Sequence, residues 1–165
     1  MSIAGQDIPP TEDGEPQLRD LFLFTGGNRL FGVPAEEVEG TAEAKNPAPL
    51  PHAPATILGV VYARGRMLTI LDPVGLAGHS PPMRASEMSA IVSLRSDEQL
   101  ALAAESVAET ITISSADIES SPASDSELTA VAGILRHGGK EITILDPASL
   151  FDAAVHRKDR RRRRF

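Results

Sequence analysis

The chain has 165 residues, 41% of them hydrophobic, and a net charge of −7. This length suffices for one ordinary domain or two small ones with a shared core, and the apolar content excludes a wholly disordered chain. The lack of cysteine excludes disulfides, thiol nucleophiles and zinc–thiolate sites, and no apolar run reaches membrane-spanning length.

The N-terminal part is expected to begin with a disordered arm at 1–17, which is polar and lacks apolar periodicity. This arm does not resemble a signal peptide, which together with the missing cysteine fits a cytoplasmic protein. LFLFTGGNRLFGVP has two β-favouring runs around Gly-Gly and predicts a hairpin. VPAEEVEGTAEA fits a short helix or the end of a strand, and the proline-rich NPAPLPHAP predicts a loop.

The rest of the chain predicts a series of short strands, in the runs ATILGVV, RMLTIL, SAIVSL, QLALAAE, ETITIS, VAGIL and EITIL. The polar SSADIESSPASDSEL predicts a loop with one helical turn at most. Short strands at close spacing favour a mainly β sandwich or small barrels over a parallel α/β sheet, because little chain remains for crossover helices. Helices are expected mainly after the two copies of TILDP.

The chain ends in a basic tail at 154–165. Residues 157–165, RKDRRRRRF, hold seven of the 16 Lys and Arg residues, which leaves nine basic and 22 acidic residues, a net charge of −13, in the remainder. Such an acidic body repels nucleic acid. The simpler interpretation of the tail is a solubilising, disordered end; the alternative is an electrostatic site for RNA, anionic lipid or an acidic partner.

The TILDP copies belong to a longer internal repeat. Gly59–Leu76 and Gly133–Leu150 align at a constant offset of 74, with eight of 18 positions identical. A weaker repeat aligns Phe31–Thr41 with Leu100–Thr110 at an offset of 69. Each half is therefore predicted to contain a hairpin, a connector, a second hairpin and a short helix.

This repeat predicts one ordered domain at 18–153, made of two similar subdomains at about 20–80 and 88–153 that pack face to face. Such packing is needed because a unit of roughly 60 residues has a marginal core by itself.

The repeated aspartates, Asp72 and Asp146, could suggest acid/base or metal chemistry. An Asp followed by Pro is also a good helix start, because the Asp oxygen accepts from free backbone N–H groups and Pro needs no N–H partner. Catalysis would require the two carboxylates close together, or a His or nucleophile beside them. We interpret both residues as structural caps in equivalent, separate places.

Positions that differ between the copies are free to serve a partner. YARGR in the first hairpin becomes RHGGK in the second, with Gly65 and Gly139 retained as expected for a turn that needs unusual φ and ψ. Arg64 occurs only in the first copy. An arginine in a turn is commonly just solvated, but beside Tyr62 and after an apolar strand it is a candidate interface anchor.

Three segments resemble the CheW family of chemotaxis coupling proteins. GVVYARGRMLTILD resembles the family segment G-V-x-N-L-R-G-x-x-x-P-(I/V)-(I/V)-D, LFLFTGGNRLFGVPAEEVEG resembles its opening, and GILRHGGKEITILDPASLF resembles its last strand pair and helix. Together they cover about residues 20–153. The resemblance implies a mainly β fold of two pseudo-symmetric five-stranded SH3-like barrels around a shared core, with a few short helices.

The resemblance also implies a non-catalytic scaffold without a cofactor, a small-molecule substrate or membrane insertion. CheW-like proteins bind the regulatory domain of a CheA-type histidine kinase and the cytoplasmic tips of methyl-accepting chemoreceptors. Arg64 matches the family's partner-binding arginine, and Val38 matches an apolar position near the receptor-binding groove. With Glu39, Val60 and Tyr62 they form the candidate partner-binding set.

The chain departs from the family pattern at several positions. The family's N-L-R-G is Y-A-R-G here. The proline that usually precedes the (I/V)-(I/V)-D segment is replaced by Thr69, and Pro73-Val74 follow Asp72 where the family often has an arginine. The family usually has an acidic residue at the position of Gly40, although Glu39 is adjacent to it here. These changes leave the fold pattern intact and suggest a divergent receptor or a chemosensory pathway unrelated to swimming.

Two other function classes have less support. A nucleic-acid-binding double β-barrel recruited through the arginine tail would need a basic, aromatic-rich face, yet the chain has no Trp, one Tyr and five Phe. An enzyme would need a convergent catalytic set, whereas the four histidines lack metal-ligand spacing and the loop serines lack a base nearby. No catalytic residue or metal ligand is predicted.

Overall fold

The computed structural model describes residues 17–95, 99–119, 130–150, 152 and 153. The strands in these residues are β1 (Leu18–Gly26), β2 (Arg29–Pro34), β3 (Val38–Glu43), β4 (Ile57–Ala63), β5 (Arg66–Leu71), β6 (Ala90–Leu94), β7 (Leu100–Ala104), β8 (Ser106–Ser114), β9 (Ile118–Glu119), β10 (Val131–His137) and β11 (Lys140–Leu145). The short helices are η2 (Ala35–Glu37), α2 (Pro73–Leu76), η3 (Ala85–Glu87), η4 (Ser115–Asp117) and a helical segment at 147–150 and 152–153.

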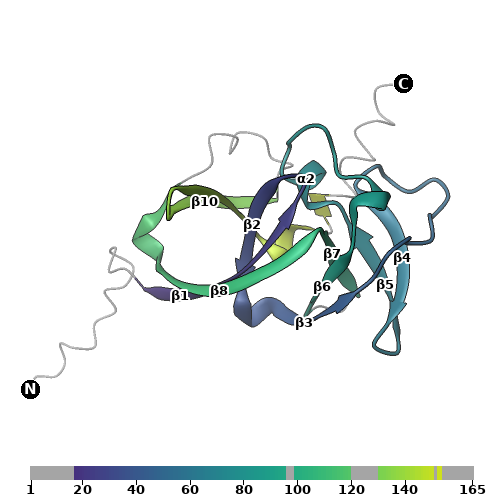
Figure 1. Ribbon diagram of the computed structural model, residues 1–165, viewed down its shortest axis with the longest axis horizontal. Helices are drawn as coiled ribbons and strands as arrows, with labels where there is room; N and C mark the ends of the chain where they lie inside the picture. Colours follow the sequence, from purple (N-terminus) through teal and green to yellow (C-terminus); the bar gives the residue numbers. More distant parts are fainter. Residues whose placement is uncertain (1–16, 96–98, 120–129, 151, 154–165) are drawn as a thin grey trace, which may run out of the picture.

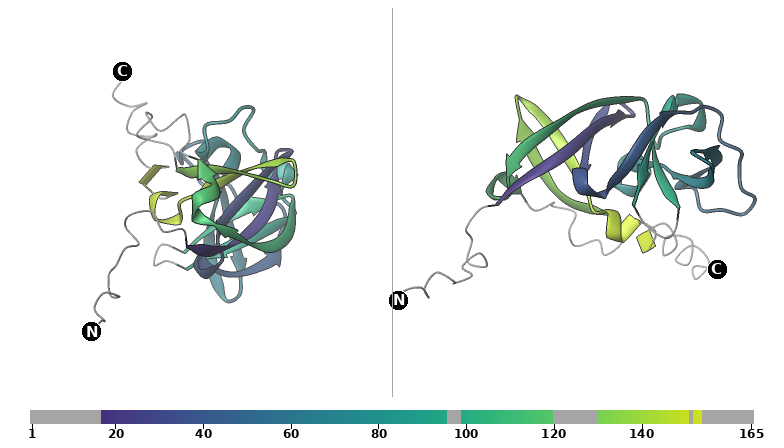
Figure 2. Two further views of the ribbon diagram at one scale, coloured as in Figure 1. Left: turned by 90° about the vertical axis from the view of Figure 1, so that its left-hand side faces the viewer. Right: turned by 90° about the horizontal axis from the view of Figure 1, so that it is seen from below.

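The strands form two sheets that lie side by side along the long axis of the molecule (Figure 1). The strand order is β8-β1-β2-β11-β10-β9 in one sheet and β3-β6-β7-β5-β4 in the other. Both sheets curl strongly (Figure 2), but within the described residues hydrogen bonds close neither into a barrel. The mainly β class and the two pseudo-symmetric units are confirmed. The structure has open, curled sheets where barrels were expected.

The hairpins of the longer repeat are equivalent strand for strand. β4, β5 and α2 correspond to β10, β11 and residues 147–150 at the offset of 74. Both hairpins carry a bulge at the same place, between Ile57 and Gly59 in the first and between Val131 and Gly133 in the second. The internal repeat is therefore a repeat of structure, including its irregularities.

The two halves of the chain exchange strands. Phe31 in β2 faces Thr143 in β11, and Leu100 in β7 faces Thr69 in β5, so each parallel pair joins one half to the other. One sheet combines β1 and β2 with β8 to β11, and the other combines β3 to β5 with β6 and β7. The contiguous subdomains expected from the sequence do not coincide with the sheets, because each first hairpin pairs with the opposite half.

Two hydrophobic cores fill the molecule. The larger core spans the β3–β7 sheet and reaches Phe24 and Phe31, whose rings stack with centroids 5.6 Å apart, as well as Leu150 of the C-terminal helical segment. The smaller core lies within the other sheet and includes Leu21 and Leu135. Since the larger core takes side chains from both sheets, it holds them together as one unit.

The remaining expectations concern VPAEEVEGTAEA, the two ends of the chain and membrane-spanning helices. VPAEEVEGTAEA contains both a short helix, η2, and a strand, β3. The expected N-terminal arm, apart from Gln17, and the arginine tail lie outside the described residues; Gln17 itself donates its N–H to the Ser115 hydroxyl at 2.9 Å. None of the helices in the described residues is long and apolar enough to cross a membrane.

Candidate partner-binding surface

The β4–β5 hairpin ends in a two-residue turn formed by Arg64 and Gly65, with φ angles of 57° and 77°. Positive φ at both central residues is typical of type I′ turns. Glycine adopts this conformation readily, whereas a residue with a side chain is strained in it. The second hairpin has Gly138 and Gly139 in these places, at 61° and 80°. The backbone conformation therefore favours glycine at 64, and arginine adopts it with some strain.

Two arginines of this hairpin contact β3. The Arg64 guanidinium covers Gly40, so that a Cβ atom added at Gly40 would lie 2.5 Å from Nη2 of Arg64. Arg66 forms an ion pair with Glu39. These side chains thus connect β3 to the tip of the β4–β5 hairpin, Arg64 from the turn and Arg66 from the start of β5. Gly40, which stands at the family's acidic position, leaves room for the Arg64 guanidinium in this arrangement.

Tyr62 and Met67 face each other across β4 and β5, and the two residues are 73% and 55% exposed. The equivalent residues of the second hairpin, Arg136 and Glu141, also face each other. An oppositely charged cross-strand pair suits a solvated sheet surface. The first hairpin instead exposes an apolar pair, which is typical of a surface covered by a partner.

Two of the expected binding residues are less accessible. Val38 begins β3, is half-buried and packs against the larger core. Val60 exchanges both of its backbone hydrogen bonds with Ala48, at 2.8 Å each. The structure therefore brings Glu39 and Arg64 together at the hairpin tip and places Val38 mainly beneath the surface.

The sequence-based reasoning missed Met67 and Arg66. The sequence does contain a sign of Met67, because the repeat aligns this apolar residue with the charged Glu141. It contains no sign of Arg66, because the contact of Arg66 with Glu39 depends on the curl of the sheet.

The two aspartates lie at helix starts in different surroundings. Asp72 is fully buried, and its carboxylate accepts from the N–H groups of Val74 at 2.9 Å and Met83 at 3.2 Å. Burial raises the pKa of Asp72 above its ordinary value of 3.8, while backbone N–H groups act in the opposite direction. Asp146 is partly exposed and accepts from the N–H of Ala148 at 3.1 Å. Both carboxylates therefore bond to backbone groups at the start of their own helix.

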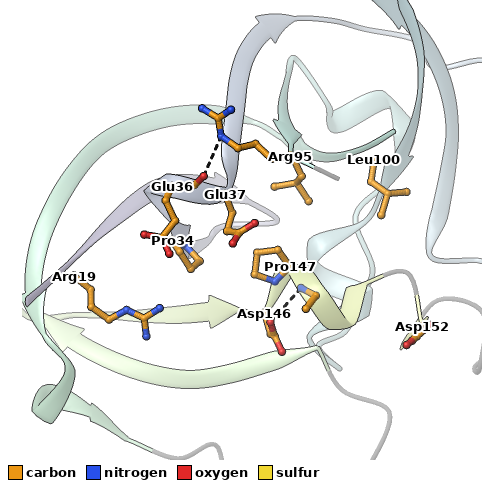
Figure 3. Close-up of a pocket in the computed structure, with 11 residues that line it drawn as sticks. Arg19, Pro34, Glu36, Glu37, Arg95, Leu100, Asp146, Pro147 and Asp152 are labelled. Carbon is orange, nitrogen blue, oxygen red and sulfur yellow. Dashed lines mark hydrogen bonds between the residues drawn. The ribbon is translucent and has the colours of Figure 1, made fainter. Parts of the chain in front are cut away.

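A cleft of about 400 Å³ lies between the two sheets (Figure 3). Arg95, at its edge, donates from Nε to the carbonyl oxygen of Glu36 at 3.0 Å. Within the described residues, neither a histidine nor a hydroxyl side chain lines this cleft, and no cluster of His, Asp and Glu is arranged to hold a metal ion. Its charged lining consists of Arg19, Glu36, Glu37, Arg95, Asp146 and Asp152.

Comparisons with known proteins identify the family to which the chain belongs. Residues 20–155 match the family model of the CheW-like domain. The chain is 33% identical over 141 residues to the chemotaxis protein CheW of Rhizobium meliloti and 28% identical over 138 residues to a probable chemotaxis protein CheW of Rhizobium etli, in both cases over 81% of this chain and 87% of the relative.

A solved structure also shares the fold. The crystal structure of the scaffolding protein CheW from Thermoanaerobacter tengcongensis superposes with a TM-score of 0.62 at 21% identity, over 78% of this chain and 89% of that chain. The matches extend over both sheets and both copies of the repeat. Together with the family model, they show that this chain belongs to the family of CheW-like domain proteins.

Proposed function

We propose that this chain is a non-catalytic adaptor that acts in the cytoplasm and couples chemoreceptors to a CheA-type histidine kinase in a chemosensory pathway. Membership in the CheW-like family supports this class of function. The main support for the position of the binding site is the exposed Tyr62–Met67 pair beside Arg64. The second copy of the same hairpin has a charged pair and no arginine in the turn.

The regulatory domain of the kinase binds what we call the tip surface, formed by Glu39, Val60, Tyr62, Arg64 and Met67. Tyrosine, methionine and arginine are favoured in the centres of protein interfaces. Glu39 is neutralised by Arg66, whereas Arg64 has no carboxylate partner among the described residues. The tip surface therefore offers an apolar patch with one available cation, which suits a partner surface that is apolar and carries an acidic group.

The chemoreceptor tip binds on the other side of β3, near Val38 and the cleft between the sheets. Glu36 and Glu37 of η2 border this cleft and immediately precede Val38. Binding there leaves the tip surface free for the kinase. An adaptor needs this separation, because it holds both partners at once.

The kinase site is tested by calorimetric titration of the chain with the regulatory domain of the CheA-type kinase from the same genome. We expect Tyr62→Ala and Arg64→Ala each to weaken binding about 30-fold, since loss of an interface anchor costs about 2 kcal/mol. Arg136→Ala and Glu141→Ala are matched controls on the second hairpin and should leave the affinity nearly unchanged. Native affinity in both tip variants would contradict the site.

The adaptor function itself is tested by reconstitution of receptor-containing membranes with the kinase. Native chain should bring the kinase to the membranes and place its activity under receptor control, and Tyr62→Ala should reduce both effects. A native chain that neither binds the regulatory domain nor recruits the kinase would contradict the function, whatever the variants do.

A further inference from the structure

We propose that the outer edge of β4 at Tyr62 accepts an extended strand of the bound kinase, so that binding adds a strand to the five-stranded sheet. This inference rests on the proposed function and specifies how the tip surface binds. β4 is the last strand of its sheet and lies at the end of the molecule remote from β10 (Figure 1). An open strand edge presents backbone N–H and C=O groups that another strand can pair with.

The backbone of β4 is open at Tyr62. Val60 directs both its N–H and its C=O away from β5, since both are bonded to Ala48. In an antiparallel ladder this direction recurs every second residue, so the N–H and C=O of Tyr62 also point outward. Neither group has a hydrogen-bond partner in the part of the chain that the structure describes.

The chain's own covering segment stops short of this position. Ala48 pairs with Val60 in an isolated antiparallel bridge, and continued pairing would place Asn46 opposite Tyr62. Asn46 has a φ of 55°, which ends the extended conformation that pairing requires. The gap at Tyr62 is therefore a defined place for a strand from another molecule.

Side chains beside this edge favour an incoming strand. Tyr62 and Met67 form an exposed apolar pair, which a side chain of the added strand would cover. The corresponding edge of β10 is different: β9 pairs with Ile134 and Leu135, and the residues beyond are Arg136 and His137. Charged side chains at a strand edge oppose pairing with other chains. The edge of β4 at Tyr62 has no such charged residue.

The chemistry of the edge distinguishes a partner strand from a second copy of this chain. Arg64 has no carboxylate partner among the described residues and lies in the turn directly after β4. The sequence of β4, ILGVVYA, has no carboxylate that could meet Arg64 if two copies paired edge to edge. We therefore expect a kinase strand with an apolar residue against Tyr62 and an acidic residue near Arg64.

Hydrogen exchange of the isotope-labelled chain, free and bound to the kinase regulatory domain, tests this proposal. The Tyr62 amide should exchange rapidly in the free chain and at least about tenfold more slowly in the complex. The Val61 amide, directed toward β5, is the internal control and should change little. Nuclear Overhauser effects should connect the Tyr62 amide proton to backbone protons of the kinase, which burial of the tyrosine ring alone would not produce.

The outcomes separate this inference from the function on which it rests. Slowed exchange at Tyr62 with intermolecular backbone contacts supports strand addition. A complex that forms, and that Tyr62→Ala weakens, without slowed exchange of the native Tyr62 amide overturns strand addition and leaves the adaptor function standing. If the native chain forms no complex with the regulatory domain, both are overturned.

Discussion

Asp72 and Asp146 occupy equivalent positions of the repeat, yet the burial of Asp72 gives it a second role. Its carboxylate holds the start of α2 through Val74 and also the distant loop that contains Met83. Asp146 bonds within its own helix start, where the carboxylate retains contact with water. The same residue type therefore contributes differently to stability, because a buried N–H that loses its acceptor cannot turn to solvent.

We expect Asp72→Ala to lower the free energy of unfolding by about 2 kcal/mol, since the backbone N–H groups of Val74, Gly75 and Met83 lose an acceptor in a buried setting. Asp146→Ala is the matched variant and should cost about 1 kcal/mol, the usual effect of losing an exposed helix cap. Urea unfolding followed by circular dichroism measures both. An equal or smaller loss for Asp72→Ala would show that its contact with Met83 adds nothing to stability.

At the scale of the element, the β4–β5 hairpin has a less favourable turn residue than the second hairpin, and that residue contributes to the tip surface. Its turn keeps the positive φ angles of the second hairpin, but it holds Arg64 where the other has Gly138. Gly40 accommodates the resulting guanidinium on β3. Strained residues with positive φ are often found at functional sites, and here the strained residue is a cation next to an exposed apolar pair.

Arg64→Gly should separate stability from binding. Glycine relieves the strain of positive φ, so the free energy of unfolding should stay unchanged or rise by up to about 1 kcal/mol. Affinity for the kinase regulatory domain should nevertheless fall as it does in Arg64→Ala, which keeps the strained backbone. Thermal unfolding and calorimetry of both variants make the comparison. Marked destabilisation by glycine would mean that Arg64 serves the fold.

At the scale of the whole molecule, the exchange of strands makes the two halves depend on each other. Parallel pairing of β2 with β11 and of β7 with β5 connects segments that are far apart in the chain. The larger core likewise takes side chains from both sheets. Neither half can therefore build a complete sheet from its own strands in the arrangement that the structure has.

Fragments spanning residues 17–84 and 85–153 test this dependence. Each alone should lack a cooperative unfolding transition as a monomer, because its hairpins lose their neighbouring strands and isolated hairpins are marginal in water. An equimolar mixture should regain the transition, as followed by circular dichroism with sedimentation to establish the molecular mass. A monomeric fragment that unfolds cooperatively would contradict the mutual dependence of the halves.

The sequence by itself determined the strands, their turns and the repeat, because alternating apolar residues, glycine turns and Asp-Pro helix starts act over a few neighbouring residues. It also pointed to Tyr62 and Arg64, since aligning the two copies shows where they differ. Only the tertiary structure decided which strands pair, because β2–β11 and β5–β7 pairing depends on contacts between distant segments. The same is true of the hairpin tip, where the curl of the sheet brings Arg64 onto Gly40. It is also true of the Tyr62 backbone, which stays open because the segment that pairs at Ala48 turns away at Asn46.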